Sequence, residues 1–232
     1  LSRRRFFQGA AIFTASGLGF PLRAATSTET WALLSDTHIA EDPGKLSRGV
    51  NLSEHLERVV AEVLQESEHL SGVIIDGDVA FNNGQSGDYT QLKKLLQPLV
   101  DAGLPIHCTL GNHDDRVNFL AAYPEADGTS ALEGKHCSVV ETEHLNLILI
   151  DTLRFVNKVE GEIGETQLEW ISDYLNQHPE KPSIILGHHY PQVFRTNAIP
   201  SDQEIKISGL VDSQPFEELL KSHPSAKAYL FG

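Results

Sequence analysis

Short apolar runs that alternate with amphipathic segments constrain the fold of this chain more than any other feature of its sequence. Residues 31–35 and 73–75 are apolar enough for buried strands, whereas residues 52–70 carry apolar side chains at helical spacing. The same alternation continues from residue 89 to residue 231. A chain of this kind buries its strands between helices, so the pattern predicts an α/β fold built in layers.

The expected elements follow from apolar spacing and from the turn residues between them. Two apolar runs joined at Glu143 and His144 predict a hairpin, and so an antiparallel pair in the sheet. Strands are predicted at residues 31–35, 73–75, 106–110, 137–140, 145–150, 183–186 and 228–231, and helices at 52–70, 89–100, 165–177 and 215–221.

Composition excludes several functional classes. The formal net charge of -14, from 32 acidic and 18 basic side chains, argues against binding of nucleic acid or anionic lipid over a broad surface. An acidic protein can still bind a phosphate when a metal ion supplies the positive charge. Two cysteines are too few for a disulfide scaffold or a four-thiolate zinc site, and a Cys108–Cys137 disulfide stays open.

The first 25 residues have the layout of an export signal. Arg3, Arg4 and Arg5 precede an apolar stretch at residues 9–20, and Ala24 and Ala25 provide small residues for cleavage. The basic start resembles a twin-arginine signal, and the apolar stretch is shorter than the roughly 20 residues of a membrane span. We expect residues 1–25 to engage the twin-arginine export machinery and residues 26–232 to form a periplasmic or extracellular domain with no stable membrane span.

Polar residues suited to metal binding follow four of the predicted strands. In chain order the motifs are Asp36-Thr37-His38, Gly77-Asp78, Gly111-Asn112-His113-Asp114 and Gly187-His188-His189. Ligands of open α/β sheets collect at the carboxyl ends of the strands. An aspartate at a strand end is more commonly a turn or helix cap, but four such motifs in order predict one shared crevice.

The chemistry of these side chains indicates divalent metal ions. Carboxylate, imidazole and amide donors suit manganese, iron or zinc. Asp36 and His38 are alternate residues, so on an extended backbone both side chains reach one ion, and the carboxylate of Asp78 can bridge two ions about 3.5–4 Å apart. Such a pair of ions holds a phosphoryl group, activates a water as hydroxide and stabilises the leaving oxygen.

With these motifs in this order, residues 31–232 resemble the calcineurin-like metallophosphoesterase superfamily. The resemblance implies a four-layer α/β/β/α sandwich of two mixed sheets and a dinuclear metal centre. It implies that Asp36 and His38 bind one ion, that Asp78 bridges, and that Asn112 and His188 bind the other. It also implies that His113 stabilises or protonates the leaving oxygen, with Asp114 orienting the His113 imidazole.

The run from Gly111 to Arg116 is similar to class III cyclic nucleotide phosphodiesterases and related glycerophosphodiesterases, as are Asp151-Thr152 and residues 164–170. This similarity favours a phosphodiester hydrolase. A phosphomonoesterase and a secreted protein that binds phosphoesters without turnover remain the alternatives. Arg116 either contacts a second ester arm or pairs with Asp115. His189 either lines the site or packs behind it, and Asp76 either supports the ligands or forms a turn.

The sequence departs from the family pattern at its end. The last motif of the superfamily, Gly-His-any-His, is absent because the sequence stops at Gly232, and residues 228–231 look like the strand that leads into it. Each of those two histidines would bind a metal ion. We therefore expect the chain as written to bind its ions poorly.

Overall fold

The carboxyl ends of three parallel strands meet at one edge of the first sheet. The structure, a computed structural model, describes residues 29–124, 131–192 and 208–232. Strands β1 (Trp31–Leu34), β4 (Gly72–Asp76) and β5 (Ile106–Thr109) lie in the order β1-β4-β5. Asp76 pairs with Thr109 and Leu34 pairs with Ile75, so the loops that follow the three strands leave the sheet side by side.

The second sheet has four strands in the order β6-β7-β8-β9. Strands β6 (Ser138–Glu141) and β7 (Asn146–Leu149) are antiparallel, which confirms the predicted hairpin. Strands β8 (Ser183–Leu186) and β9 (Ala226–Leu230) continue the sheet in parallel. The loop after β8 therefore leaves this sheet at the end that carries Leu149 and Leu230.

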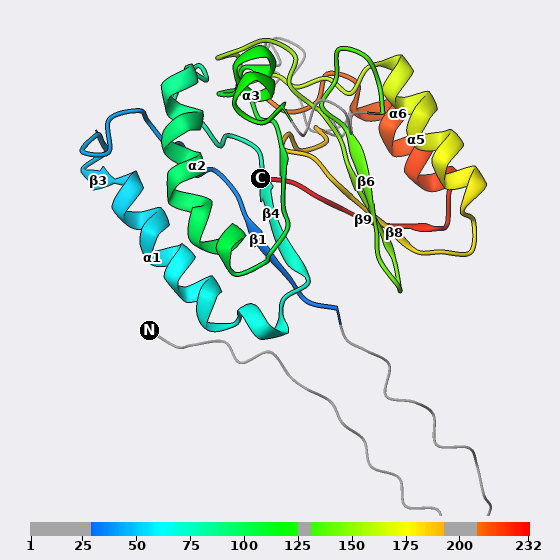
Figure 1. The fold of residues 1–232 in the computed structure, drawn as a ribbon. Helices are drawn as coiled ribbons and strands as arrows, with labels where there is room; N and C mark the ends of the chain where they lie inside the picture. Colours follow the sequence, from blue (N-terminus) through cyan, green and yellow to red (C-terminus); the bar gives the residue numbers. More distant parts are fainter. Residues whose placement is uncertain (1–28, 125–130, 193–207) are drawn as a thin grey trace, which may run out of the picture.

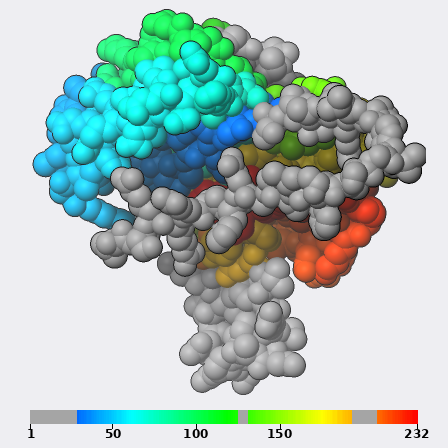
Figure 2. Space-filling view, turned by 90° about the horizontal axis from the view of Figure 1, so that it is seen from below, coloured from blue at the N-terminus to red at the C-terminus, as the bar shows by residue number. Residues whose placement is uncertain are grey.

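Helices cover the outer faces of the two sheets, which gives the predicted four layers (Figure 1). Helices α1 (Leu52–Gln65) and α2 (Ser86–Asp101) cover the first sheet, and α5 (Glu165–Gln177) and α6 (Ser213–Ser222) cover the second. Seen from below, the blue to green first half and the orange-red α6 lie on opposite sides of the molecule (Figure 2).

Alternation along the strands divides the core into three layers. On β4, Val73 and Ile75 pack against α1 and α2, while Ile74 packs toward the second sheet with Leu147 and Leu149 of β7. Successive side chains of a strand point to opposite faces, so one buried strand serves two layers. Burial of each such side chain contributes about 1.5–3 kcal/mol to folding.

Most predicted elements are confirmed, and the differences have local causes. The helix predicted at residues 52–70 ends at Gln65 and is followed by the 3-10 helix η1 (Ser67–His69). Helix α3 (Arg116–Ala122) and the small hairpin of β2 (Leu46–Ser47) and β3 (Val50–Asn51) were not predicted. These elements are too short for a repeated apolar pattern, and α3 depends on its cap, the Asp115 carboxylate accepting from the Asn118 N–H at 2.9 Å.

Three further predictions concern the export signal, membrane-spanning helices and the two cysteines. The predicted signal, residues 1–25, lies outside the described residues. In the described ranges, no helix combines the length and the apolar character that a bilayer span requires. Cys108 and Cys137, both in the described part, are not joined by a disulfide.

Candidate metal centre

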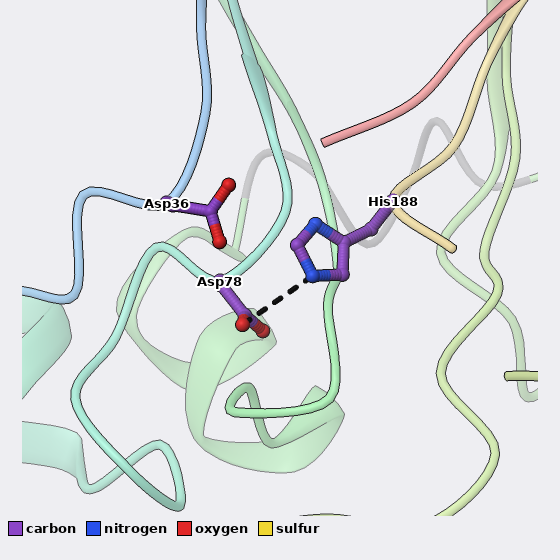
Figure 3. A group of neighbouring side chains, drawn as sticks. All are labelled: Asp36, Asp78 and His188. Atoms are coloured by element: carbon purple, nitrogen blue, oxygen red, sulfur yellow. Dashed lines mark ion pairs between the residues drawn. The ribbon is translucent and has the colours of Figure 1, made fainter. Parts of the chain in front are cut away.

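Asp36, Asp78 and His188 come together where the two sheets meet (Figure 3). Asp36 follows β1, Asp78 follows β4 and His188 follows β8, so the first sheet supplies two of the side chains and the second supplies one. One donor atom from each lies within 4.8 Å of the others, and His188 Nε2 is 3.3 Å from Asp78 Oδ2. Asp78 and His188 are buried, whereas Asp36 is exposed and leaves the cluster open to solvent on its side.

His38 joins the same group of side chains. Its Nε2 lies 3.5 Å from Asp36 Oδ1 and 3.8 Å from Asp78 Oδ2. The prediction that Asp36 and His38 face one ion from an extended backbone was wrong in its geometry, because both residues are left-handed, with φ of 54° and 47°. The Asp36 N–H donates to the Gly77 carbonyl and the His38 N–H donates to the Asp78 carbonyl, and these bonds hold the loop after β1 against the loop after β4.

Strained backbone marks the candidate centre. Asp78 has a φ of 47°, and Asn82, in the same loop, has a φ of 56°. A left-handed conformation at a residue other than glycine costs about 1–3 kcal/mol and persists where the surroundings require it. Such strain is concentrated at binding and catalytic sites, so its coincidence with the proposed ligands supports a functional role for these loops.

Two glycines allow the side chains to approach. A Cβ on Gly77, which has a φ of +72°, would lie 2.5 Å from the His188 ring. A Cβ on Gly111 would lie 2.2 Å from Asp78 Oδ1 and 2.7 Å from His188 Cδ2. Both separations are far below van der Waals contact, so only glycine fits at these two positions without moving Asp78 or His188.

The carboxylates of the centre favour the protonated forms of His38 and His188. The hydrogen bond from His38 lowers the pKa of Asp36, and the pKa of His38 is raised in return. Burial acts against the charged forms of Asp78 and His188, but their mutual hydrogen bond prevails: it lowers the pKa of Asp78 and raises the pKa of His188 to about 9. The negative charge of Asp36 and Asp78 therefore favours positive charge at this position.

The loop after β5 carries the remaining predicted residues. The His113 N–H donates to Asp78 Oδ1 at 2.8 Å, so this loop lies directly against the cluster. The His113 ring lies edge-on to the His38 ring with centroids 5.2 Å apart. Asn112 stands between Gly111 and His113, and both of these neighbours lie against Asp78. The Asn112 carbonyl accepts from the Asn157 N–H at 2.6 Å.

Asp114 has a different partner from the one that the resemblance implies. Its carboxylate accepts from the backbone N–H groups of Val79, Ala80 and Gly111 at 2.9–3.2 Å, and from the Tyr89 hydroxyl. The His113 imidazole is instead bound through Nδ1 to the Asn82 carbonyl. Asp114 thus joins the loop that follows Asp78 to the loop that carries Asn112, and Asn82 orients His113. Burial raises the pKa of Asp114 to about 7.

Asp76 and His189 lie behind the cluster. Asp76 ends β4, and its Oδ1 accepts from the Thr109 hydroxyl at 2.6 Å across the sheet, so it forms no turn. Burial raises the pKa of Asp76 to about 6. His189 is buried with Nδ1 2.7 Å from the Thr152 hydroxyl, and burial together with His188 lowers its pKa to about 4. His189 therefore packs behind His188 as a neutral ring.

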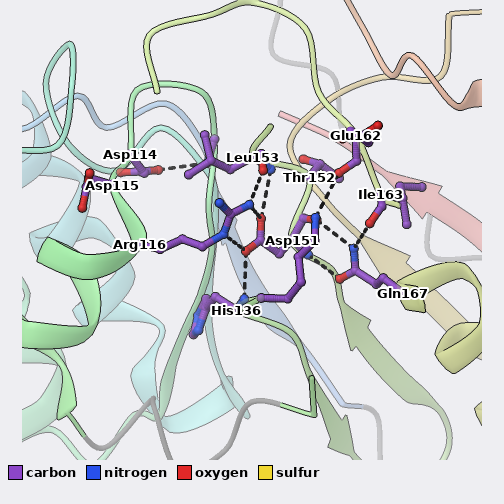
Figure 4. A network of polar contacts seen from close by, with 12 residues as sticks. Asp114, Asp115, Arg116, His136, Asp151, Thr152, Leu153, Glu162, Ile163 and Gln167 are labelled. Carbon is purple, nitrogen blue, oxygen red and sulfur yellow. Dashed lines mark hydrogen bonds and ion pairs between the residues drawn. The ribbon is translucent and has the colours of Figure 1, made fainter. Parts of the chain in front are cut away.

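Arg116 forms an ion pair with Asp151, which neither sequence interpretation predicted (Figure 4). Arg116 Nε and Nη2 lie 2.6 and 2.8 Å from the two oxygens of the fully buried Asp151, and Nη2 also donates to the Leu153 carbonyl. Asp151 further accepts from the His136 N–H, and its own N–H donates to Gln167 of α5. In the sequence, Asp151 stands directly after an apolar strand, and this position was the only signal for it. Its pairing with Arg116 was not predictable, because the two residues meet only in the folded chain.

The donor set fits divalent metal ions. Two ligands at about 2.0–2.2 Å from one ion are at most about 4.4 Å apart, so small rotations would bring the donors of Asp36, Asp78 and His188 onto one ion. His38 adds an imidazole donor, with its Nε2 3.5 Å from Asp36 Oδ1 and 3.8 Å from Asp78 Oδ2. Carboxylate, imidazole and amide donors select borderline ions such as manganese, iron or zinc.

Comparisons with known proteins agree with this architecture. A family model described as calcineurin-like phosphoesterase matches residues 30–232. The chain is 27% identical over 199 residues to the 3',5'-cyclic adenosine monophosphate phosphodiesterase CpdA of Pseudomonas aeruginosa, covering 86% of this chain and 66% of that protein. It is 28% identical over 160 residues to a probable cyclic nucleotide phosphodiesterase of Psychrobacter arcticus, covering 66% of this chain and 55% of that protein.

The chain thus spans about half to two thirds of the length of these relatives. Among solved structures, a purple acid phosphatase from yellow lupin seeds superposes with a TM-score of 0.50 at 15% identity, covering 72% of this chain and 32% of that one. A likeness at this identity concerns the fold, and it agrees with the four layers described above.

Proposed function

Because the chain belongs to the calcineurin-like phosphoesterase family, we propose that it hydrolyses phosphate esters with divalent metal ions, and phosphodiesters in preference to monoesters. The observation that carries this proposal is the convergence of Asp36, Asp78 and His188 from three strand ends. The relatives named as cyclic nucleotide phosphodiesterases support the preference for diesters.

Each ligand has an assigned place in the proposal. Asp36 and His38 would hold one ion, Asn112 and His188 would hold the other, and Asp78 would serve both. Such ions would supply positive charge for the phosphoryl oxygens and would lower the pKa of a bound water. Binding requires neutral imidazoles, so His38 and His188 lose the protons that Asp36 and Asp78 now stabilise.

We infer that His113 assists the leaving group. A carbonyl oxygen only accepts, so the contact with the Asn82 carbonyl requires the proton of the His113 ring to lie on Nδ1. Nε2 is then the ring nitrogen that we assign to the substrate. Hydrolysis breaks one phosphorus–oxygen bond as water adds to phosphorus, and a doubly protonated His113 donates its Nε2 proton to the departing alkoxide.

The experiment compares two chromogenic substrates with each metal. We expect protein loaded with manganese, zinc or ferrous iron to hydrolyse bis(p-nitrophenyl) phosphate faster than p-nitrophenyl phosphate, and chelator to abolish both activities. Asn112→Ala should lower kcat on the p-nitrophenyl diester by about 10²-fold or more, and His113→Ala should lower kcat by a similar factor on a diester with an alkoxide leaving group, which needs the proton. His69→Ala, a matched change in the exposed η1, should leave the rate unchanged.

Three results would redirect the assignment. Normal rates in both Asn112→Ala and His113→Ala would contradict the proposed roles. A higher kcat/KM for the monoester would make the protein a phosphomonoesterase. Tight metal binding with no hydrolysis of either ester would make it a binding protein for phosphoesters.

We further propose that residues 1–25 direct export through the twin-arginine machinery, because Arg3, Arg4 and Arg5 precede an apolar stretch. An exported enzyme would meet external phosphodiesters rather than intracellular cyclic AMP. Fusion of residues 1–25 to a reporter that is exported only when folded tests this. The reporter should reach the periplasm, and replacing Arg4 and Arg5 by lysine should retain it in the cytoplasm.

A further inference from the structure

A pocket of about 490 Å³ opens between α3 and the loops at residues 132–135 and 153–156, and Arg116, which pairs with Asp151, lies in its wall. Its apolar lining consists of Val117, Leu120, Leu132, Leu153 and Val156. Val117 is 77% exposed and Val156 is 37% exposed, which is unusual for two valines that line one hollow. Apolar side chains exposed together in a concave surface mark a place where a ligand binds.

Two connections place this pocket next to the metal ligands. Asp115, on the pocket wall, is two residues from His113, so their Cα atoms are at most about 7.6 Å apart. On the opposite wall, Val156 precedes Asn157, whose N–H donates to the Asn112 carbonyl at 2.6 Å. A phosphate held at Asn112 and His113 therefore has this pocket within reach of one of its ester groups.

Three of the four charged residues of the pocket already have partners. Arg116 is committed to Asp151 and to the Leu153 carbonyl. Lys135 Nζ lies 3.3 Å from the carbonyl oxygens of Asp151 and Glu162, and the Asp115 carboxylate caps α3. Glu133 adds an exposed negative charge to the lining. An anionic group would find no free positive charge among these partners and would meet the Glu133 carboxylate, whereas the apolar side chains of the lining suit an uncharged group.

We propose that this pocket binds a neutral, apolar ester group of the substrate, aryl or nucleoside-like in size, and so determines which phosphodiesters the enzyme prefers. This inference rests on the proposed function and narrows its substrate class. In this proposal, Arg116 forms part of the pocket wall and pairs with Asp151, and it does not contact a second ester arm of the substrate. Val117 and Val156 become residues that determine specificity, with no part in bond breaking.

The test varies only the ester group that the pocket would hold. Phenyl p-nitrophenyl phosphate and methyl p-nitrophenyl phosphate share one chromogenic leaving group and differ in the other ester. We expect wild type to favour the phenyl ester by at least about tenfold in kcat/KM. The double variant Val117→Ser/Val156→Ser should lose most of that preference, because its KM should rise more for the phenyl ester than for the methyl ester. The matched control is Val100→Ser, an exposed valine of α2.

A binding measurement decides the inference without turnover. Calorimetry on the metal-loaded protein compares diphenyl phosphate with dimethyl phosphate. Stronger binding of diphenyl phosphate that is lost in the double variant supports the pocket, even if the protein hydrolyses no ester and the proposed function fails. Equal affinities for the two phosphates, or an equal loss of both in the double variant, overturn it. Because both valines are exposed, the variants should fold, and circular dichroism checks this.

Discussion

At the scale of single residues, Gly111 determines how closely the loop after β5 approaches Asp78. A Cβ at this position would lie 2.2 Å from Asp78 Oδ1 and 2.5 Å from the Asp78 backbone nitrogen. We predict that Gly111→Ala displaces Asp78, destabilises the protein by about 1–3 kcal/mol and weakens metal binding at least tenfold. Denaturant unfolding and calorimetric titration with zinc measure the two effects.

The matched control for this prediction is Gly44→Ala. The nearest atom to a Cβ on Gly44 is Asp42 Oδ1 at 3.4 Å, an ordinary contact, so we expect no change in metal affinity. If Gly111→Ala bound zinc as tightly as Gly44→Ala, the close approach of Gly111 to Asp78 would have no role in the metal centre.

His188 makes the stability of the metal-free protein depend on pH. Asp78 raises the pKa of His188 to about 9, against about 6.5 in an unfolded chain. Because the folded state holds this proton more tightly than the unfolded chain, protonated His188 stabilises the fold fully below pH 6.5. This contribution to the free energy of unfolding is lost as the pH rises through 9. In the presence of chelator, we predict that the free energy of unfolding falls by on the order of 2 kcal/mol between pH 6.5 and 9.5.

Urea unfolding of wild type and of His188→Gln at several pH values checks this prediction. The glutamine does not titrate, so its variant should lack this part of the pH dependence. A wild-type stability that stays constant or rises over this range would show that the His188–Asp78 pair does not retain its proton at neutral pH.

At the scale of elements, the Arg116–Asp151 pair fastens α3 to the end of β7. Arg116 opens α3, and Asp151 follows β7 in the second sheet, where Gln167 of α5 holds its backbone. Removal of the guanidinium leaves a buried carboxylate without its counter-charge. We therefore predict that Arg116→Met costs about 3 kcal/mol of stability. Arg58→Met, at an exposed arginine of α1, should cost less than about 0.5 kcal/mol, and similar losses for both would contradict the prediction.

The same elements show what sequence could and could not predict. Strands and long helices were predictable because apolar residues repeat along them, and the carboxyl ends of the strands located Asp36, Asp78, Asn112 and His188. The partners of Asp114 and Arg116 were not predictable, because they depend on which loops meet after the sheets form. Asp114 bonds to backbone N–H groups 34 and 35 residues away in sequence, and no side-chain pattern encodes a backbone partner.

At the scale of the whole molecule, the metal centre lies between two sheets that otherwise meet through apolar packing. Ile74 of the first sheet packs with Leu147, Leu149 and Leu186 of the second. The backbone N–H of Gly232, at the end of the chain, donates to the His188 carbonyl at 3.2 Å, and a Cβ there would lie 2.6 Å from His188 Nδ1. Gly232, which follows β9, therefore lies against His188, so the loop after β9 also borders the candidate metal centre.

Because the proposed ligands come from both sheets, metal binding should stabilise the molecule as a unit. A ligand at one hundred times its Kd stabilises the folded state by about 2.7 kcal/mol. We predict a rise of this order in the unfolding free energy with zinc or manganese, seen as one transition with a higher Tm. His188→Ala removes the ligand of the second sheet and should lose most of the rise, while His69→Ala should keep it. An equal rise in wild type and His188→Ala would mean that the ions bind to the first sheet alone, and the centre would then not join the two halves of the fold.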